Sequence, residues 1–243
     1  FPDTYEIGMS NVGMRILYGI MNNMEGVWCE RAFAPWGDME EEMRSHHLPL
    51  WTLESHDPLE EFDVIAFSLG YEMAYSNVLN MLELGNIPLK SCDRGDSLKH
   101  LVIAGGTSVY NPEPMADFLD ICIEGEGEDV DVELLECYRS AKRRGLGRHA
   151  FLLEAAKIPG IYVPSLYEHT YNDDGTIREI IPLEGAPKIV TKRIVQDMDA
   201  AYYPTETIVP STQIVHDRTV LELFRGCIRG CRFCQAGFCY RPV

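Results

Sequence analysis

The sequence has 243 residues, with a hydrophobic fraction of 46% and a charged fraction of 24%, values typical of a globular protein with one large domain or a domain and part of a second. Its formal net charge of −17 at pH 7 disfavours nucleic acid as a partner, because an acidic surface repels phosphates. No apolar run of about 18 residues occurs, so no membrane-spanning helix is predicted. The chain shows no secretory signal and begins with Phe1 rather than Met, so we expect a fragment of a longer cytoplasmic protein.

The first elements are predicted from helix caps and from apolar periodicity. Ser10 is a suitable N-cap for a helix that ends at about Met24, with apolar side chains on one stripe. Residues 27–33 are expected to form a short strand. Asp38 is followed three residues later by Glu41, a pattern that resembles a capping box and predicts a short acidic helix.

Three apolar runs predict strands buried on both faces of a parallel sheet, at residues 63–69, 101–104 and 120–123. Helices are expected over residues 74–84 and 129–143, and each is followed by a glycine that can end it. The alternation of strands and helices predicts a doubly wound parallel sheet, a Rossmann-like α/β fold.

Small or glycine-rich segments follow each of these predicted strands. Because ligands bind beyond the carboxyl ends of the strands in such sheets, these segments predict a ligand site, although tight turns are the alternative explanation. No G-x-G-x-x-G signature occurs, so a nicotinamide or flavin cofactor has little support. The predicted site residues here are Ser68, Gly70, Gly105, Gly106, Thr107, Gly125 and Glu126.

The chain is expected to have three parts. The α/β domain is assigned to residues 1–147. From 148 to 215 repeated prolines interrupt the pattern, which predicts a connector with short strands at residues 161–163 and 176–182. The third part, residues 216–243, contains a crowded group of cysteines.

Cys227, Cys231 and Cys234 follow a predicted strand over residues 219–224, with the spacing C-x3-C-x2-C. Thiolates at this spacing on one loop can converge on an iron–sulfur cluster, and neighbouring glycines let the loop curl around it. A cubane cluster bound by three thiolates leaves one of its irons open to a substrate.

Structural zinc is the competing interpretation of this motif. Zinc requires four ligands, and Cys239 or His216 is available as the fourth. Zinc ligands usually come as two separated pairs, whereas three cysteines here lie within residues 227–234, so the spacing favours a cluster. The remaining scattered cysteines are expected to be reduced thiols, with Cys122 as a buried apolar residue.

The cysteine motif, with Phe233 before its last cysteine, resembles the signature of the radical S-adenosylmethionine superfamily. Other segments are similar to radical enzymes with an N-terminal cobalamin-binding-like domain, and the resemblance covers nearly the whole chain. These segments are residues 1–10, 105–107, 111–114, 125–128, 230–237 and 240–243.

This resemblance implies that Cys227, Cys231 and Cys234 bind a [4Fe–4S] cluster, with S-adenosylmethionine on the open iron. An external electron donor would reduce the cluster, and cleavage of the sulfonium would produce a 5′-deoxyadenosyl radical that attacks an unknown substrate. Phe233 would lie near the adenine. Gly8 and Ser10, within the first resembling segment, would join the strand-end residues in a cobalamin-type site.

Two departures limit this resemblance. No D-x-H-x-x-G motif occurs, and His46, His47 and His56 lie in polar contexts where we expect them to be solvated. The domain is therefore expected to bind cobalamin without a protein ligand to cobalt, or to have lost that cofactor. The chain also ends just after the cysteine loop, so we expect a truncated barrel, no catalytic residue and no activity of its own.

Two other functions stay open. A methylthiotransferase would carry a second cluster on three further cysteines, and Cys29, Cys92 and Cys122 are candidates, although the surrounding motif is missing. A cofactor-sensing or interaction module without catalysis is the non-enzymatic alternative. An iron count separates the first of these from a protein with one cluster.

Overall fold

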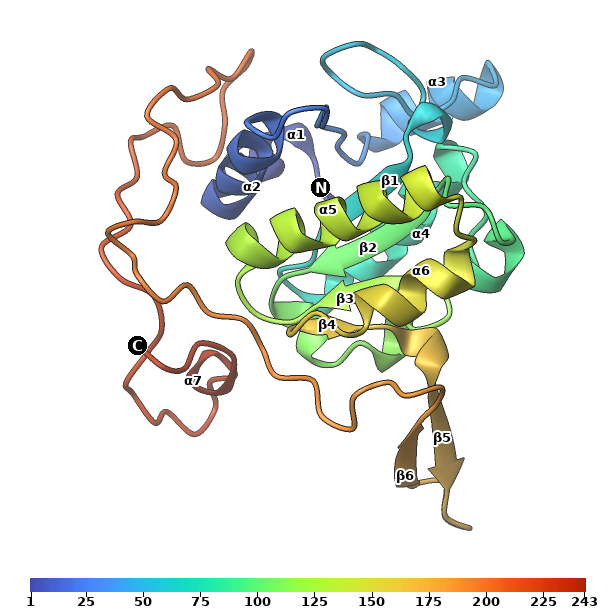
Figure 1. Cartoon of the computed structure of the whole chain (residues 1–243). Coiled ribbons are helices and arrows are strands. Elements are labelled where there is room, and N and C mark those ends of the chain that lie inside the picture. The colour runs from blue at the N-terminus through green and yellow to red at the C-terminus, as the bar shows by residue number, and fades with distance from the viewer.

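Four short strands form the central sheet of the structure, a computed structural model that describes residues 1–243 (Figure 1). The strands are β1 (Val64–Ser68), β2 (Leu101–Gly105), β3 (Ile121–Ile123) and β4 (Ile161–Tyr162), in that order across the sheet. The first three pair in parallel, whereas β4 pairs antiparallel with β3. The α/β fold and its parallel strands were predicted from sequence and are confirmed, with the antiparallel edge as an addition.

Helices cover both faces of this sheet, so the central strands are apolar on both sides. On one face α4 (Tyr75–Leu84) packs against a core that includes Val102 and Ala104 of β2. On the other face α5 (Gly127–Arg144) and α6 (Arg148–Ala155) pack against a second core. The predicted helices 74–84 and 129–143 are confirmed, with α5 beginning slightly earlier than expected.

The N-terminal helices are α1 (Tyr5–Gly8) and α2 (Val12–Asn22), and α2 packs against α5. Ser10 was predicted to cap α2, but the cap is Asn11, whose Oδ1 accepts a hydrogen bond from the Met14 N–H at 2.9 Å. Ser10 lies one residue too early, and its hydroxyl donates to the Glu6 carbonyl instead.

The predicted acidic helix exists as α3 (Gly37–Ser45), but its capping box does not. Trp36 occupies the N-cap position without a side-chain hydrogen bond, and the Asp38 carboxylate accepts the N–H of the adjacent Met39. Asp38 lies inside the first turn, so its side chain cannot act as the cap that the spacing suggested.

The strand predicted at residues 27–33 is absent. This segment is extended, but side chains satisfy several backbone groups that a neighbouring strand would otherwise bind. Asn22 exchanges two hydrogen bonds with the backbone of Cys29, and Glu54 accepts the N–H of Arg31. The apolar pattern therefore predicted the extended conformation correctly, but not the pairing of this segment in a sheet.

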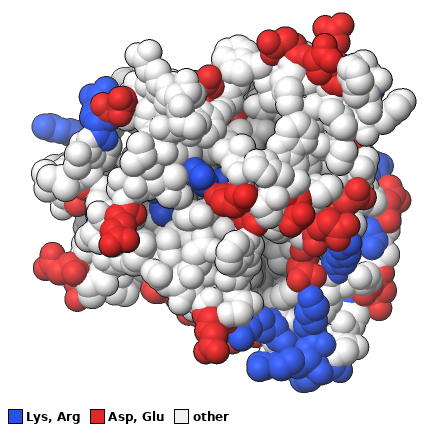
Figure 2. All heavy atoms as spheres, turned by 90° about the horizontal axis from the view of Figure 1, so that it is seen from above, with Lys and Arg blue, Asp and Glu red and all other residues white.

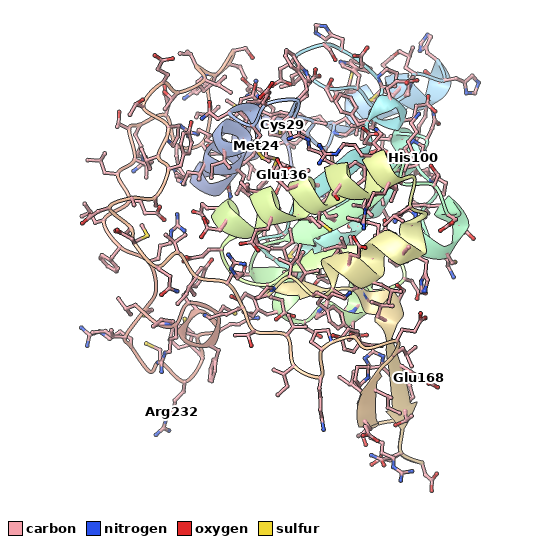
Figure 3. The ribbon with its side chains drawn as sticks, in the orientation of Figure 1. Met24, Cys29, His100, Glu136, Glu168 and Arg232 are labelled. Carbon is pink, nitrogen blue, oxygen red and sulfur yellow. The ribbon has the colours of Figure 1, made fainter.

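The expected connector contributes both α6 and β4 to the α/β unit and then forms a separate hairpin. This hairpin consists of β5 (Tyr167–Tyr171) and β6 (Ile177–Pro182), with a register shift between Thr170 and Tyr171. It projects away from the sheet, as the position of Glu168 shows (Figures 1 and 3). Sequence reasoning found β4 and β6 and missed α6 and β5.

The strand predicted at residues 219–224 does not form, because no other strand pairs with it. Its apolar side chains are exposed, with Leu223 at 83%.

A short helix, α7 (Ala236–Cys239), follows the cysteine motif. The remaining short elements are 3-10 turns: η1 (Leu59–Glu61), η2 (Glu72–Ala74), η3 (Ser91–Arg94), η4 (Thr107–Tyr110), η5 (Glu113–Met115) and η6 (Pro164–Leu166).

Charge is unevenly distributed over the surface. Acidic side chains are spread over the face shown in Figure 2, whereas basic side chains gather mainly at its lower right, with a few at the upper left and near the centre. None of the helices has the length and apolarity needed to cross a membrane.

Candidate functional site

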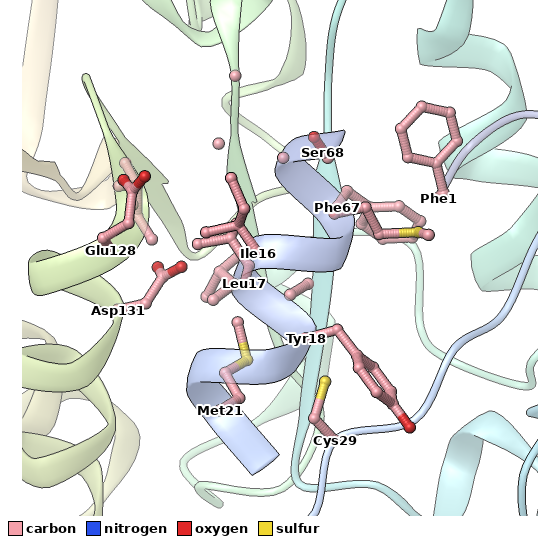
Figure 4. Close-up of a pocket in the computed structure, with 18 of the residues that line it drawn as sticks. Phe1, Ile16, Leu17, Tyr18, Met21, Cys29, Phe67, Ser68, Glu128 and Asp131 are labelled. Carbon is pink, nitrogen blue, oxygen red and sulfur yellow. The ribbon is translucent and has the colours of Figure 1, made fainter. Parts of the chain in front are cut away.

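A cavity of about 750 Å³ lies between α2, the edge strand β1 and the start of α5 (Figure 4). Apolar side chains of α2, such as Ile16, Leu17 and Met21, form one wall. The opposite wall contains Ala66 and Ser68 of β1, and their small side chains leave space between the sheet and α2. Ala66 is exposed although both of its neighbours in the strand are buried.

The structure brings together several strand-end residues that the sequence indicated. Ser68, Gly105, Gly106, Gly125 and Glu126 all line this cavity. They lie at the carboxyl ends of β1 and β2 and just after β3, as expected for parallel strands. The carboxyl ends of these strands therefore form part of the cavity wall.

Four other indicated residues lie outside the cavity lining. Thr107 donates a hydrogen bond to the Gly70 carbonyl at 2.8 Å, so these two residues stabilise a turn. Gly8 packs so closely against Phe33 that a Cβ at position 8 would lie 2.2 Å from its ring. Ser10 accepts the N–H of His216 at 3.0 Å, at a distance from the sheet edge.

Two of the cavity glycines also have conformational reasons to be glycine. Gly106 has φ of 106° and Gly125 has φ of 107°. A Cβ would lie 2.5 Å from the Leu69 carbonyl oxygen at position 106 and 2.0 Å from the Arg193 carbonyl oxygen at position 125. Tight turns thus account for these glycines, and the cavity walls are formed by the same turns.

Asp131 is a functional candidate that sequence reasoning missed. It lies on α5 with its side chain directed toward Leu17 of α2 (Figure 4), is 6% exposed and makes no hydrogen bond within the chain. Burial, with a smaller contribution from Glu128, raises the pKa of Asp131 to about 7. Its position between Val130 and Leu134 on the buried face of α5 was the available signal.

Other titratable groups around the sheet edge are perturbed by burial. Desolvation raises the pKa of Glu124 to about 7 and that of the Cys29 thiol to about 12. Cys29 lines the cavity, Cys92 is exposed on η3 and Cys122 is fully buried in β3. These three thiols lie in three different parts of the chain, and the structure does not bring them together.

The cysteine loop, residues 225–241, lies beside the cavity. Cys227 lines the cavity and, like Cys234, is half-buried, whereas Cys231 is exposed. The Cys234 N–H donates to the Cys231 carbonyl at 3.2 Å, and the Arg229 N–H donates to the Cys227 sulfur at 3.4 Å. These bonds constrain the backbone of the motif, whose three thiols the structure does not gather into one metal-binding arrangement.

The donor set of this loop fits an iron–sulfur cluster in its chemistry. Three thiols share one short loop, and a backbone N–H already contacts one sulfur, a contact that tunes cluster potentials. The structure does not gather any three His, Cys, Asp or Glu side chains into a metal-binding arrangement. Phe233, expected near an adenine, is 93% exposed.

The zinc alternative lacks a fourth ligand in position. Cys239 is buried in α7, and burial raises the pKa of its thiol. His216 has its Nδ1 3.2 Å from Arg218 Nη2 and its backbone bound to Ser10. The structure therefore brings neither Cys239 nor His216 together with the thiols of the motif.

Comparison with known proteins identifies the class of this chain. The family described as "Radical SAM proteins, N-terminal", where SAM is S-adenosylmethionine, matches residues 13–164, more than half of the chain. The chain belongs to this family. The matched residues run from α2 through β4, so they include the sheet and most of the cavity wall.

One curated relative is an uncharacterized protein of Methanocaldococcus jannaschii, to which the chain is 28% identical over 202 residues. The match covers 82% of this chain and 36% of the relative, so the chain spans about a third of that protein's length. No solved structure matches the chain.

Proposed function

We propose that this chain is the N-terminal part of a radical S-adenosylmethionine enzyme and that Cys227, Cys231 and Cys234 bind its [4Fe–4S] cluster. The observation that carries the proposal is the C-x3-C-x2-C motif, which lies beside the cavity of a chain that belongs to the radical SAM N-terminal family. The cluster, when bound and reduced by an external donor, supplies the electron that cleaves S-adenosylmethionine.

The residues of this chain have defined roles in that proposal. The three thiolates would hold the cluster, while Gly226, with φ of 90°, lets the backbone turn into the first of them. The Arg229 N–H orients the Cys227 sulfur and stabilises its negative charge.

The cavity supports a second component of the proposal, an organic cofactor of the cobalamin class. Its largely apolar walls suit an organic ligand, and its volume of about 750 Å³ would enclose part of a corrinoid. No histidine lines it, and His46, His47 and His56 are exposed, so a corrinoid would receive no imidazole ligand from this chain.

Anaerobic reconstitution with iron and sulfide tests the cluster assignment. The wild-type chain should acquire the broad visible absorption of an iron–sulfur cluster, and Cys231→Ala should abolish it. Cys239→Ala is the matched control and should retain the absorption, because this thiol is buried in α7 and lies outside the C-x3-C-x2-C motif. Survival of the absorption in Cys231→Ala would show that the three-thiol assignment is wrong.

A further inference from the structure

Arg225 directly precedes Gly226 and Cys227, and three carboxylates surround its guanidinium group. Its Nε and Nη2 each lie 2.8 Å from oxygens of Glu222. Nη2 also lies 2.6 Å from Oε1 of Glu128, and Nη1 lies 3.5 Å from Oε2 of Glu126. We call these four residues the Arg225 ion cluster.

This ion cluster is shielded enough to be more than an ordinary surface pair. The side chain of Arg225 is 17% exposed, and those of Glu128 and Glu126 are 10% and 24% exposed. Exposed pairs contribute little because water and salt screen them, whereas partly buried pairs with several hydrogen bonds contribute more. The carboxylates outnumber the cation, so without Arg225 they would repel one another.

The partners of Arg225 come from two separate parts of the chain. Glu222 belongs to the segment that leads into the cysteine loop, whereas Glu126 and Glu128 lie in the turn after β3 and the first turn of α5. Both of the latter also line the cavity. The ion cluster therefore joins the cysteine loop to the cavity wall.

The far end of the cysteine loop is fixed independently. The carbonyl of Cys239 accepts hydrogen bonds from the Tyr110 hydroxyl at 3.2 Å and from Lys192 Nζ at 2.8 Å. Within the loop, the Cys227 N–H donates to the Tyr240 carbonyl at 3.0 Å. Arg225 is thus the ionic contact at the start of a loop whose two ends are bonded together.

We infer that Arg225 is a positioning residue of the cysteine loop, whose contacts with Glu126 and Glu128 hold Cys227 at the cavity of the α/β unit. Its relevance to a cluster rests on the proposed function, but its effect on the loop can be measured without iron. A movement of the turn after β3 would therefore shift Cys227, because the guanidinium group of Arg225 connects the two.

Hydrogen exchange on the purified iron-free chain tests the inference. Arg225→Gln should speed exchange of the Cys227 amide, which donates to the Tyr240 carbonyl, on the order of tenfold, while β1, β2 and β3 remain protected. Arg232→Gln is the matched control, because Arg232 is exposed and extends away from the molecule (Figure 3). Equal protection of the Cys227 amide in Arg225→Gln and wild type would overturn the inference.

A second variant separates ion pairing from simple packing. Adding Glu128→Gln to Arg225→Gln removes one uncompensated carboxylate, so the double variant should recover part of the lost protection. If the double variant instead loses as much amide protection as the two single variants added together, the positioning role is contradicted. Loss of packing alone would give this additive result.

Iron uptake then distinguishes this inference from the proposed function. If the wild-type chain binds a cluster, Arg225→Gln should bind less iron and Arg225→Lys should recover part of it, because lysine keeps the charge but lacks the planar fork. If the wild-type chain binds no cluster while Arg225→Gln still loosens the loop, the proposed function fails and the positioning role stands.

Discussion

Gly125 and Arg193 lie side by side in a parallel β-bridge, although one belongs to the sheet edge and the other to the connector. The Glu126 N–H donates to the Arg193 carbonyl, and the Arg193 N–H donates to the Glu124 carbonyl, each at 2.9 Å. The Arg193 side chain also pairs with Glu133 of α5 at 2.8 Å. This bridge fixes the connector across the carboxyl end of β3.

Gly125→Ala should break this bridge. The new Cβ would lie 2.0 Å from the Arg193 carbonyl oxygen, and φ of 107° is unfavourable for alanine. We expect a loss of about 3 kcal/mol in the free energy of unfolding, measured by urea denaturation. Gly175→Ala is the control, because φ is 82° there but no atom lies within 4 Å of the added Cβ. Equal losses in the two variants would argue against the bridge as a constraint.

Asp131 should make the stability of the chain depend on pH. Because burial raises its pKa to about 7, the folded state holds a proton that the unfolded state releases near pH 4. This group therefore destabilises the fold progressively as pH rises from about 4 to 7, and fully above that range. Asp131→Asn should be more stable than wild type at pH 8, by up to about 4 kcal/mol, with little difference near pH 4.

Thermal or urea unfolding across pH 4 to about 8 checks this prediction. Asp174→Asn is the control, because hydrogen bonds from the Thr176 side chain and backbone lower the pKa of Asp174, so its replacement gives no gain at high pH. If Asp131→Asn is less stable than wild type at pH 8, the prediction is contradicted, because the Asp131 carboxylate would then be charged and paired in the folded state.

Asp120 should be among the most sensitive polar positions in the fold. Its carboxylate lies 2.9 Å from both Arg94 and Arg148, and it also accepts the Val102 N–H at 2.7 Å. Asp120→Asn leaves two buried guanidinium groups without a counterion, so we expect a loss of about 3–5 kcal/mol by urea denaturation. Asp63→Asn removes an exposed partner of Lys142 and should cost less than about 1 kcal/mol. Similar losses would mean that burial does not amplify the Asp120 contacts.

Ala66→Phe should fill the cavity from the β1 side and exclude an organic ligand. After anaerobic incubation with hydroxocobalamin and gel filtration, the wild-type chain should retain cobalt, and the variant should retain on the order of tenfold less. Ala200→Phe adds the same side chain at an exposed position outside the cavity and should bind as wild type does. Absence of cobalt from the wild-type chain would remove cobalamin from the proposal.

The sequence predicted the parts of this fold that depend on local patterns. Apolar runs located β1, β2 and β3, and glycines marked the ends of α4 and α5, because these signals lie within a few residues. The strand expected at residues 219–224 failed because a strand needs a partner, which no local pattern supplies. The strand predicted at residues 27–33 was wrong for the same reason. This segment is extended, but the side chains of Asn22 and Glu54 accept hydrogen bonds from its backbone in place of a neighbouring strand.

In the candidate site, too, the residues set by local patterns could be predicted, and those that depend on distant parts of the chain could not. The strand-end residues Ser68, Gly105 and Gly125 could be anticipated because parallel strands end at one edge. Asp131 could not, because its burial depends on the packing of α2 against α5. The carboxylates around Arg225 are likewise contributed by a turn far away in the sequence, and only the folded chain brings them to the cysteine loop.

An iron count on the anaerobically reconstituted chain tests the central claim most directly. The account predicts about four iron atoms per chain, together with acid-labile sulfide, and loss of both in each of the Cys227→Ala, Cys231→Ala and Cys234→Ala variants. About eight irons would indicate a second cluster, and one tightly bound zinc in place of iron would indicate a structural site. Either result would contradict the assignment of a single three-thiolate cluster to this loop.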